Sequence, residues 1–219
     1  MIEFVKKVPL FSQLSEQQLE AVAYICNRKT YRAGTVLFSE KELGSIFYMV
    51  HSGSVKVYTT SSNHEEKILS IFKSGDSFGE LSLIDGKPRS ASAQTLEESI
   101  LITITGNSFT ELLRNHFDIN LGIMQELCSR LRDTNQHVHD LTFLDARTRV
   151  IKSLIKMANK NGIRSGNMIT IKLVLNFDEI SQLAGVQKAT LMQVIRDLEE
   201  KSILSISPED FKLDLAKLR

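Results

Sequence analysis

The sequence predicts an α+β fold with an N-terminal β-barrel or sandwich, a long helix and a C-terminal winged helix–turn–helix. Short runs rich in Val, Ile, Phe and Tyr, separated by glycines, fill residues 30–105 and indicate several short strands. An apolar repeat of 4 and 3 residues follows them and indicates a long helix. Near the C-terminus two amphipathic stretches meet at a Gly-containing turn ahead of a predicted hairpin. These three observations together set the fold class.

The N-terminal stretch "FSQLSEQQLEAVAYIC" predicts a short helix that begins after Ser15. Ser15 is followed three residues later by Gln18, which is the spacing of a capping box. The strands predicted after it are the runs "TVLF", "SIFYMV", "SVKVYTT", "KILSIF" and "ILITIT". The run "SVKVY" alternates apolar and polar residues, as a half-buried strand should.

The stretch "NSFTELLRNHFDINLGIMQELCSRLRDTNQHVHDLTFLD" predicts the long helix. Within it an apolar seam steps by 4, 3, 4 and 3 residues through Leu127, Leu131, Thr134, Val138 and Leu141. That spacing is typical of a coiled coil and predicts a dimerisation helix. Packing of the same seam against the chain's own barrel is the alternative.

The C-terminal part begins with a helix from "FLDARTR" to about residue 161, which "NGIRSGN" then ends. "MITIKLVL" predicts a strand, and "NFDEISQLAGVQKATLMQVIRDLEEKSIL" predicts two helices, the first capped by Asn176 with Glu179. The tail predicts a hairpin that turns at Pro208, Glu209 and Asp210. The side chains predicted to face the core are Ile180, Leu183, Ala184, Leu191, Val194 and Ile195.

The outward face of the second of these helices carries hydrogen-bonding side chains near its N-terminus, where DNA-binding helices read base edges. These candidate DNA-binding residues are Gln187, Lys188, Thr190 and Gln193. The alternative is a purely structural helical hairpin. Charge favours DNA: residues 146–219 hold 13 Lys/Arg against 8 Asp/Glu, whereas residues 1–145 hold 14 against 18. A chance asymmetry would look the same.

Composition places the chain among ordinary soluble proteins. It has 219 residues, of which 42% are hydrophobic and 24% charged, enough for one large or two modest domains. Two cysteines, Cys26 and Cys128, are too few for a disulfide framework and suit a reducing compartment. No apolar run approaches the roughly 18 residues of a membrane helix, and the start does not resemble a signal peptide. We therefore expect a cytoplasmic protein with no membrane partner.

The stretch "FGELSLIDGKPRSASA" places a carboxylate and a guanidinium close together in what reads as a strand region. A cyclic phosphate needs a cation and free backbone N–H groups, and a ribose hydroxyl needs an acceptor. Glu80 could supply the acceptor, and Arg89 and Ser90 could bind the phosphate. For a single spacing of this kind, an ordinary surface salt bridge between Glu80 and Arg89 is the commoner explanation.

Nearly the whole chain resembles the bacterial cyclic-AMP receptor protein (CRP/FNR) family. "VPLFSQLSEQQLEAVA" is similar to the family's opening, "GSIFYMVHSGSVKVY" to its central barrel strands, and "FGELSLIDGKPRSASA" to its phosphate-binding cassette. The resemblance implies a jelly-roll sensor domain over residues 1–118, a dimerisation helix over 119–144 and a winged helix–turn–helix over 145–219. It also implies a homodimer that binds double-stranded DNA and RNA polymerase under the control of a cyclic nucleotide, with cAMP favoured. The ligand-binding positions implied by the resemblance are Gly79, Glu80, Leu81, Arg89, Ser90, Arg130, Thr134 and Asn135.

The sequence departs from the family pattern at two places. Asn135 stands where the cyclic-AMP sensor has a Ser that reaches the base from the partner subunit, which leaves the base identity open. On the recognition helix, Lys188, Ala189 and Gln193 stand where the family often has an Arg-Glu pair and a later Arg. Lys can reach a guanine edge and Gln an adenine edge, so we expect a non-consensus DNA site.

Two alternatives to a cyclic-nucleotide sensor remain. One keeps the DNA-binding regulator but gives it another small effector, or activity without any. The other is a metal-dependent enzyme in the barrel, which would want clustered His and carboxylate ligands, whereas the barrel offers only His51 and His64. No Gly-x-Ser-x-Gly nucleophile elbow or triad spacing occurs, so we expect no enzyme, no metal and no resident cofactor.

Overall fold

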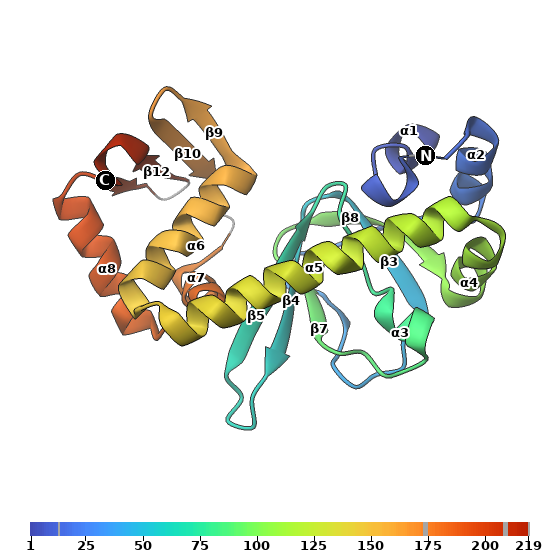
Figure 1. The fold of residues 1–219 in the computed structure, drawn as a ribbon, viewed down its shortest axis with the longest axis horizontal. Helices are drawn as coiled ribbons and strands as arrows, with labels where there is room; N and C mark the ends of the chain where they lie inside the picture. Colours follow the sequence, from blue (N-terminus) through green and yellow to red (C-terminus); the bar gives the residue numbers. More distant parts are fainter. Residues whose placement is uncertain (13, 173–174, 208–209, 219) are drawn as a thin grey trace. The chain divides into compact units, whose positions relative to one another are not determined.

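The computed structural model describes residues 1–12, 14–172, 175–207 and 210–218 (Figure 1). The chain forms two compact units, Met1–Thr134 and Asn135–Arg219. They are described separately below. The boundary between them falls inside the long helix α5, Phe117–Phe143.

Three short helices open the first unit: α1 Ile2–Val5, the 3-10 helix η1 Pro9–Phe11, and α2 Glu16–Tyr24. The predicted capping box at Ser15 is confirmed, because its hydroxyl accepts from the Gln18 N–H and the Gln18 side chain accepts from the Ser15 N–H. Val5, Phe11 and Val22 are fully buried. The N-terminal segment therefore belongs to the core of this unit.

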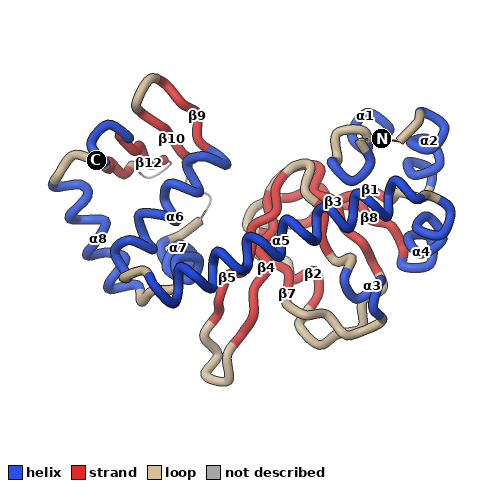
Figure 2. The backbone as a smooth tube through the Cα atoms, in the orientation of Figure 1, coloured by secondary structure: helices blue, strands red, loops and turns tan. Residues whose placement is uncertain are grey.

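The barrel consists of two four-stranded antiparallel sheets with crossed connectivity, and the predicted fold class is confirmed (Figure 2). One sheet has the order β1-β8-β3-β6, with β1 Asn27–Tyr31, β8 Ser99–Thr105, β3 Ile46–Ser52 and β6 Ser77–Phe78. The other has the order β2-β7-β4-β5, with β2 Val36–Phe38, β7 Ser92–Thr95, β4 Ser54–Thr60 and β5 Glu66–Lys73. All five predicted strands occur, and β1, β6 and β7 are additional.

The barrel interior is closed by stacked aromatic side chains. The Phe78 ring lies 5.1 Å from that of Tyr48 and 5.2 Å from that of Phe72, both stacked. Such contacts contribute beyond the burial of area alone. A second apolar cluster joins Phe47 and Phe109, whose rings stack at 4.6 Å, to the N-terminal helices. Together these clusters fix the strand ends from which the candidate site projects.

Two helical features correct the sequence-based expectations. The apolar run after Glu80 is not a strand but a short helix, α3 Leu81–Asp85, which ends at Gly86 in the left-handed region (φ 68°). The predicted single long helix is two, α4 Gly106–Asn115 and α5, because His116 between them is extended. Thr105 caps α4 by accepting from the Ser108 N–H.

An exposed apolar stripe runs along α5. Leu127, which the predicted seam includes, is half-buried and packs against the barrel's apolar cluster, so it does not belong to the exposed stripe. The other four members of the predicted seam, Leu131, Thr134, Val138 and Leu141, are exposed. Phe117, Leu121 and Met124 extend the exposed apolar face toward the start of α5, and Phe143 is exposed at its end. Cys128 is exposed at the remaining heptad position between Met124 and Leu131. Packing against the chain's own barrel, the alternative raised by the sequence, therefore applies to Leu127, and dimerisation through the exposed side chains stays a prediction.

The second unit contains three helices and one four-stranded sheet. Its helices are α6 Ala146–Asn161, α7 Phe177–Ala184 and α8 Lys188–Glu200, followed by the 3-10 helix η2 Leu215–Leu218. Its sheet has the order β11-β12-β10-β9, with β11 Leu204–Ile206, β12 Asp210–Asp214, β10 Met168–Lys172 and β9 Gly162–Ser165. The segment predicted only to end α6 thus forms a strand of its own.

Capping and turn chemistry in this unit follow the sequence. The predicted Asn176–Glu179 capping box starts α7, Gly185 (φ 65°) ends it, and Asp145 caps α6 by accepting from Thr148. The predicted core residues are buried, except that Leu183 is only partly so. The C-terminal hairpin forms as β11 and β12, but Pro208 and Glu209 of its predicted turn lie outside the described residues.

Candidate functional site

The candidate site lies where β6 ends and α3 begins. Gly79 links the two elements at φ 86°, a left-handed conformation that favours glycine. A Cβ at Gly79 would also lie 2.9 Å from Nη1 of Arg89, which is too close. The next residue, Glu80, is 5% exposed, and Arg89 after α3 is equally buried. The two charged side chains predicted from the sequence are therefore both interior groups.

Arg89 is held by neutral acceptors. Its Nη1 donates to the carbonyl of Gly79 (2.7 Å) and to Ser82 Oγ (3.1 Å), and its Nη2 donates to the carbonyl of Ile46 (2.7 Å). The guanidinium also stacks on the ring of Phe38 at 4.1 Å. Burial lowers the pKa of Arg89, although the group stays protonated at any physiological pH. Its Nε–H is buried and has no hydrogen-bond partner among the described residues.

Glu80 is held by one cation from α5. Oε1 of Glu80 accepts from Nη1 of Arg130 at 2.9 Å, and Arg130 also pairs with Glu126 at 3.0 Å. The third donor of Arg130, Nη2, bonds to the carbonyl of Ser77, and its guanidinium lies over the ring of Phe72. The second carboxylate oxygen of Glu80, Oε2, is buried and accepts no hydrogen bond from the described residues. Among the described residues Glu80 pairs with Arg130 and not with Arg89. A surface salt bridge between Glu80 and Arg89 therefore does not explain why the sequence places the two side chains close together.

The remaining predicted ligand-binding residues lie on the surface. Leu81 is 44% exposed, and Ser90 is exposed beside the buried Arg89. Thr134 is exposed, and its hydroxyl donates to the carbonyl of Arg130 one turn earlier (2.9 Å). Asn135 is exposed as the first residue of the second unit. The structure thus brings together Gly79, Glu80, Arg89 and Arg130.

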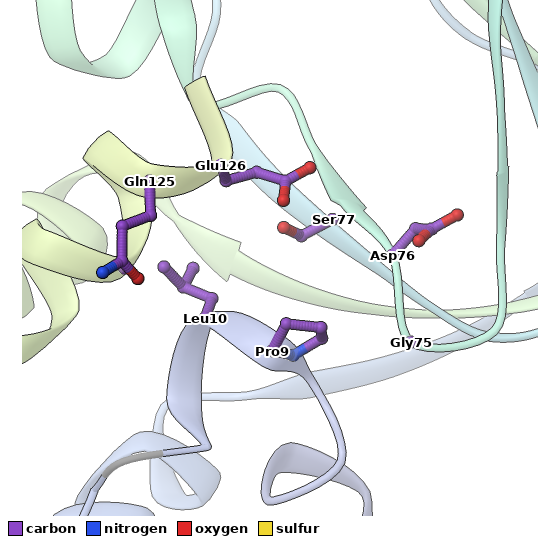
Figure 3. Close-up of a pocket in the computed structure, with 8 residues that line it drawn as sticks. Pro9, Leu10, Gly75, Asp76, Ser77, Gln125 and Glu126 are labelled. Carbon is purple, nitrogen blue, oxygen red and sulfur yellow. The ribbon is translucent and has the colours of Figure 1, made fainter. Parts of the chain in front are cut away.

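Two cavities lie where Leu10 of η1, Ser77 of β6 and Glu126 of α5 meet. The larger, about 180 Å³, is lined by η1, the turn before β6, and α5, and contains none of the predicted ligand residues (Figure 3). The smaller, about 10 Å³, is lined by Glu80, Arg130 and Glu126 among others and has room for about one water molecule. No sequence signal identified Glu126, Ser82 or Phe38 as neighbours of the site, because these contacts join distant segments.

The candidate DNA-binding side chains lie together at the start of α8. Lys188 is its first residue, Gln187 is its N-cap, and both are exposed, as is Gln193. Thr190 is only partly exposed. Sequence reasoning missed one basic neighbour, Arg196, which is exposed one turn after Gln193 and whose spacing on the helix could have found it.

Among the described residues, no three or more His, Cys, Asp or Glu side chains lie close enough together to hold a metal ion. His51 packs against Phe4 with ring centroids 4.8 Å apart, and burial lowers its pKa. His64 lies at the exposed turn between β4 and β5. No helix of the described residues is long and apolar enough to cross a membrane.

The chain is similar in sequence to known proteins over most of its length. The family profile named cyclic nucleotide-binding domain matches residues 28–116. A protein of Mycobacterium tuberculosis named CRP-like cAMP-activated global transcriptional regulator is 29% identical, covering 93% of this chain and 95% of its own. The cyclic AMP receptor protein of Thermus thermophilus is also 29% identical, covering 93% and 91%.

Solved structures share the fold. A c-di-GMP-responsive global regulator of Xanthomonas campestris superposes with a TM-score of 0.78 at 22% identity, covering 91% of this chain and 99% of its own. The catabolite activator protein of Thermus thermophilus superposes with a TM-score of 0.57 at 28% identity, covering 96% and 95%. The first of these likenesses concerns the fold alone.

Proposed function

Because this chain belongs to the CRP/FNR family of transcriptional regulators, we propose that it is a homodimeric DNA-binding regulator controlled by a cyclic nucleotide. The nucleotide binds in the β-barrel of residues 1–118, the helix of residues 119–144 dimerises, and residues 145–219 bind DNA. The names of the two relatives at 29% identity favour cAMP as the ligand to test first.

One observation carries the ligand proposal. The buried Nε–H of Arg89 is a charged donor without an acceptor, and the buried Oε2 of Glu80 is an acceptor without a donor, as far as the described residues go. Buried polar groups are nearly always paired, so such exceptions call for a ligand or an ordered water. A ligand that carries both an anion and a hydroxyl group satisfies both, and a cyclic nucleotide is such a ligand.

The residue roles follow from that pairing. Arg89 and Ser90 bind the cyclic phosphate, and Glu80 accepts from the ribose hydroxyl. The turn at Gly79 and the first residue of α3, Leu81, bring backbone N–H groups to the same ligand. On α5, Arg130, Thr134 and Asn135 complete the ligand-binding set, with Thr134 and Asn135 on the base.

Arg130 couples the pocket to α5. It belongs to α5 and pairs with Glu80 at 2.9 Å. A hydroxyl that donates to Oε2 of Glu80 shares the carboxylate charge with Arg130, which is bound to Oε1, and so weakens that ion pair. Ligand binding therefore changes the relative free energy of two arrangements of α5. A ligand shifts a population between two conformations in this way when it interacts with them differently.

The exposed stripe on α5 supports a homodimer. Leu131 is 61% exposed and Phe117 72% exposed, and an apolar heptad stripe of this kind is stable in water when a second helix covers it. We expect Leu131→Arg to shift the protein from dimer to monomer in sedimentation analysis. Leu43→Arg is the matched control, because Leu43 is 82% exposed but lies off the helix. A dimer that survives Leu131→Arg would exclude this interface.

On DNA, Gln187, Lys188, Thr190 and Gln193 read base edges in the major groove. Lys188 suits guanine and Gln193 adenine, so the preferred site differs from one read by an Arg-Glu pair. We propose RNA polymerase as a further partner of such a regulator. The proposal includes no enzymatic activity and a cytoplasmic location; the two relatives named above carry names of regulators.

Calorimetric titration of the purified protein with cAMP tests the ligand, with cGMP and cyclic di-GMP in parallel. Saturable binding of one cyclic nucleotide at about one per subunit supports the proposal. Ser90→Ala should weaken that binding without loss of stability. Lys87→Ala changes another exposed residue of the same loop and should leave nucleotide binding unchanged. Absence of heat with all three, combined with tight DNA binding by the free protein, would favour a regulator with another effector or with none.

A further inference from the structure

A carboxylate on α7 neutralises the leading cation of the recognition helix. Oδ2 of Asp178 lies 2.8 Å from Nζ of Lys188, and the two side chains are 57% and 55% exposed. Asp178 is in the first turn of α7 and Lys188 is the first residue of α8. An acidic side chain therefore lies on the surface that the proposed function turns toward a polyanion.

The backbone around this ion pair is fixed by groups other than Asp178. The start of α7 is secured by the Asn176–Glu179 capping box, with hydrogen bonds of 2.9 and 3.0 Å. The turn between α7 and α8 is secured by Gly185, whose carbonyl accepts from Arg149 at 3.1 Å. The side chain of Asp178 is therefore available for a role other than holding the helices together.

The charge of Asp178 affects how Lys188 binds to non-specific DNA. A lysine adds to non-specific binding by displacing a counterion from phosphate, whatever the DNA sequence. While Lys188 is paired with Asp178, the pair has no net charge and contributes nothing to that term. If Lys188 turns to DNA, the Asp178 carboxylate is left unpaired near the phosphates, which opposes binding. Only a base edge with two well-placed acceptors, such as O6 and N7 of guanine, offers enough in return.

We propose that Asp178 is a specificity-determining residue that withholds Lys188 from non-specific DNA. The inference rests on the proposed DNA-binding function. It adds that contacts of Lys188 with phosphates at non-specific sites are disfavoured, because they break the ion pair with Asp178. Breaking this exposed ion pair costs the same small free energy at every DNA site, and a bidentate base contact outweighs that cost whereas a single phosphate contact does not. Specificity here comes from an element that disfavours the wrong sites.

The test measures DNA binding of the full-length protein by fluorescence anisotropy at salt concentrations between about 50 and 300 mM. The slope of the binding constant against salt concentration reports how many phosphate contacts the protein makes. The probes are a duplex selected from a random library by the wild-type protein and the same duplex scrambled. We expect Asp178→Asn to tighten binding to the scrambled duplex by roughly three- to tenfold and to steepen its salt slope by about 0.9. Affinity for the selected duplex should change less, so the ratio between the two falls.

Glu200→Gln is the matched control, since it makes the same charge change at the exposed far end of α8. It should leave both affinities within about twofold, which is the spread expected of remote surface changes. An Asp178→Asn effect no larger than that of Glu200→Gln would overturn the inference. An effect of equal size in a Lys188→Ala background would also overturn it, because Asp178 would then act on phosphate directly. If the wild-type protein selects no duplex at all, the proposed function itself fails.

Discussion

Replacing Arg89 by Leu should destabilise the folded protein as well as remove a phosphate contact. The guanidinium donates to Gly79, Ser82 and Ile46, and it is 5% exposed. Leucine leaves those three acceptors without their donor. Each buried unpaired group costs about 1–3 kcal/mol, and neighbouring losses are not additive, so we expect a total of about 3–5 kcal/mol. That is a large fraction of a typical unfolding free energy of about 5–15 kcal/mol.

Urea unfolding followed by far-UV circular dichroism measures this loss, because the chain has no Trp to serve as a fluorescence probe. Ser90→Ala is the control; it changes an exposed neighbour and should stay within about 0.5 kcal/mol of the wild type. A loss below about 1 kcal/mol for Arg89→Leu would refute the reasoning. If the large loss occurs, weaker nucleotide binding by Arg89→Leu cannot be assigned to the phosphate alone, and Ser90→Ala becomes the cleaner test of the pocket.

Two further predictions concern titratable groups. Burial raises the pKa of Cys26 to about 12, so iodoacetamide at pH 8 should leave Cys26 unlabelled in the native protein and label it fully in guanidinium; native labelling detected by peptide mass spectrometry would contradict this. Burial raises the pKa of Asp140, but hydrogen bonds from Lys152 (2.6 Å) and Gln136 (2.9 Å) outweigh it, and the net pKa lies below the usual 3.8. A carboxyl group whose pKa is lowered by folding stabilises the fold at pH values above its pKa in the unfolded protein. That stabilisation is lost as the pH falls through its pKa in the folded protein. Asp140→Asn should therefore reduce the unfolding free energy at pH 7 by roughly 0.5–1 kcal/mol, and the difference should vanish well below pH 3.8, whereas a constant difference would exclude this ionisation as its cause.

Local chemistry explains why much of the fold could be predicted. Capping boxes at Ser15 and Asn176 and the left-handed cap at Gly185 act within a few residues, so they can be read from sequence spacing. The helix–turn–helix is predictable for the same reason. The run "SVKVY" forms β4 as predicted, but its burial does not alternate, because Lys56 is as buried as Val55 and Tyr58. The short α3 was missed because five residues carry too little periodicity to distinguish a helical turn from a buried strand.

The residues whose chemistry suits an anion, a hydroxyl group and a base edge can be identified from the sequence alone. What those residues contact depends on how the chain packs. Arg89 is bound to carbonyls from β3 and the β6–α3 turn, Glu80 to Arg130, fifty residues away, and Lys188 to an aspartate on the preceding helix. Side chains find such partners through chain crossings that no local pattern encodes, and the atoms left unpaired become known only once every neighbour is in place. The orphaned Nε of Arg89 and Oε2 of Glu80, on which the ligand proposal depends, are properties of the packed barrel.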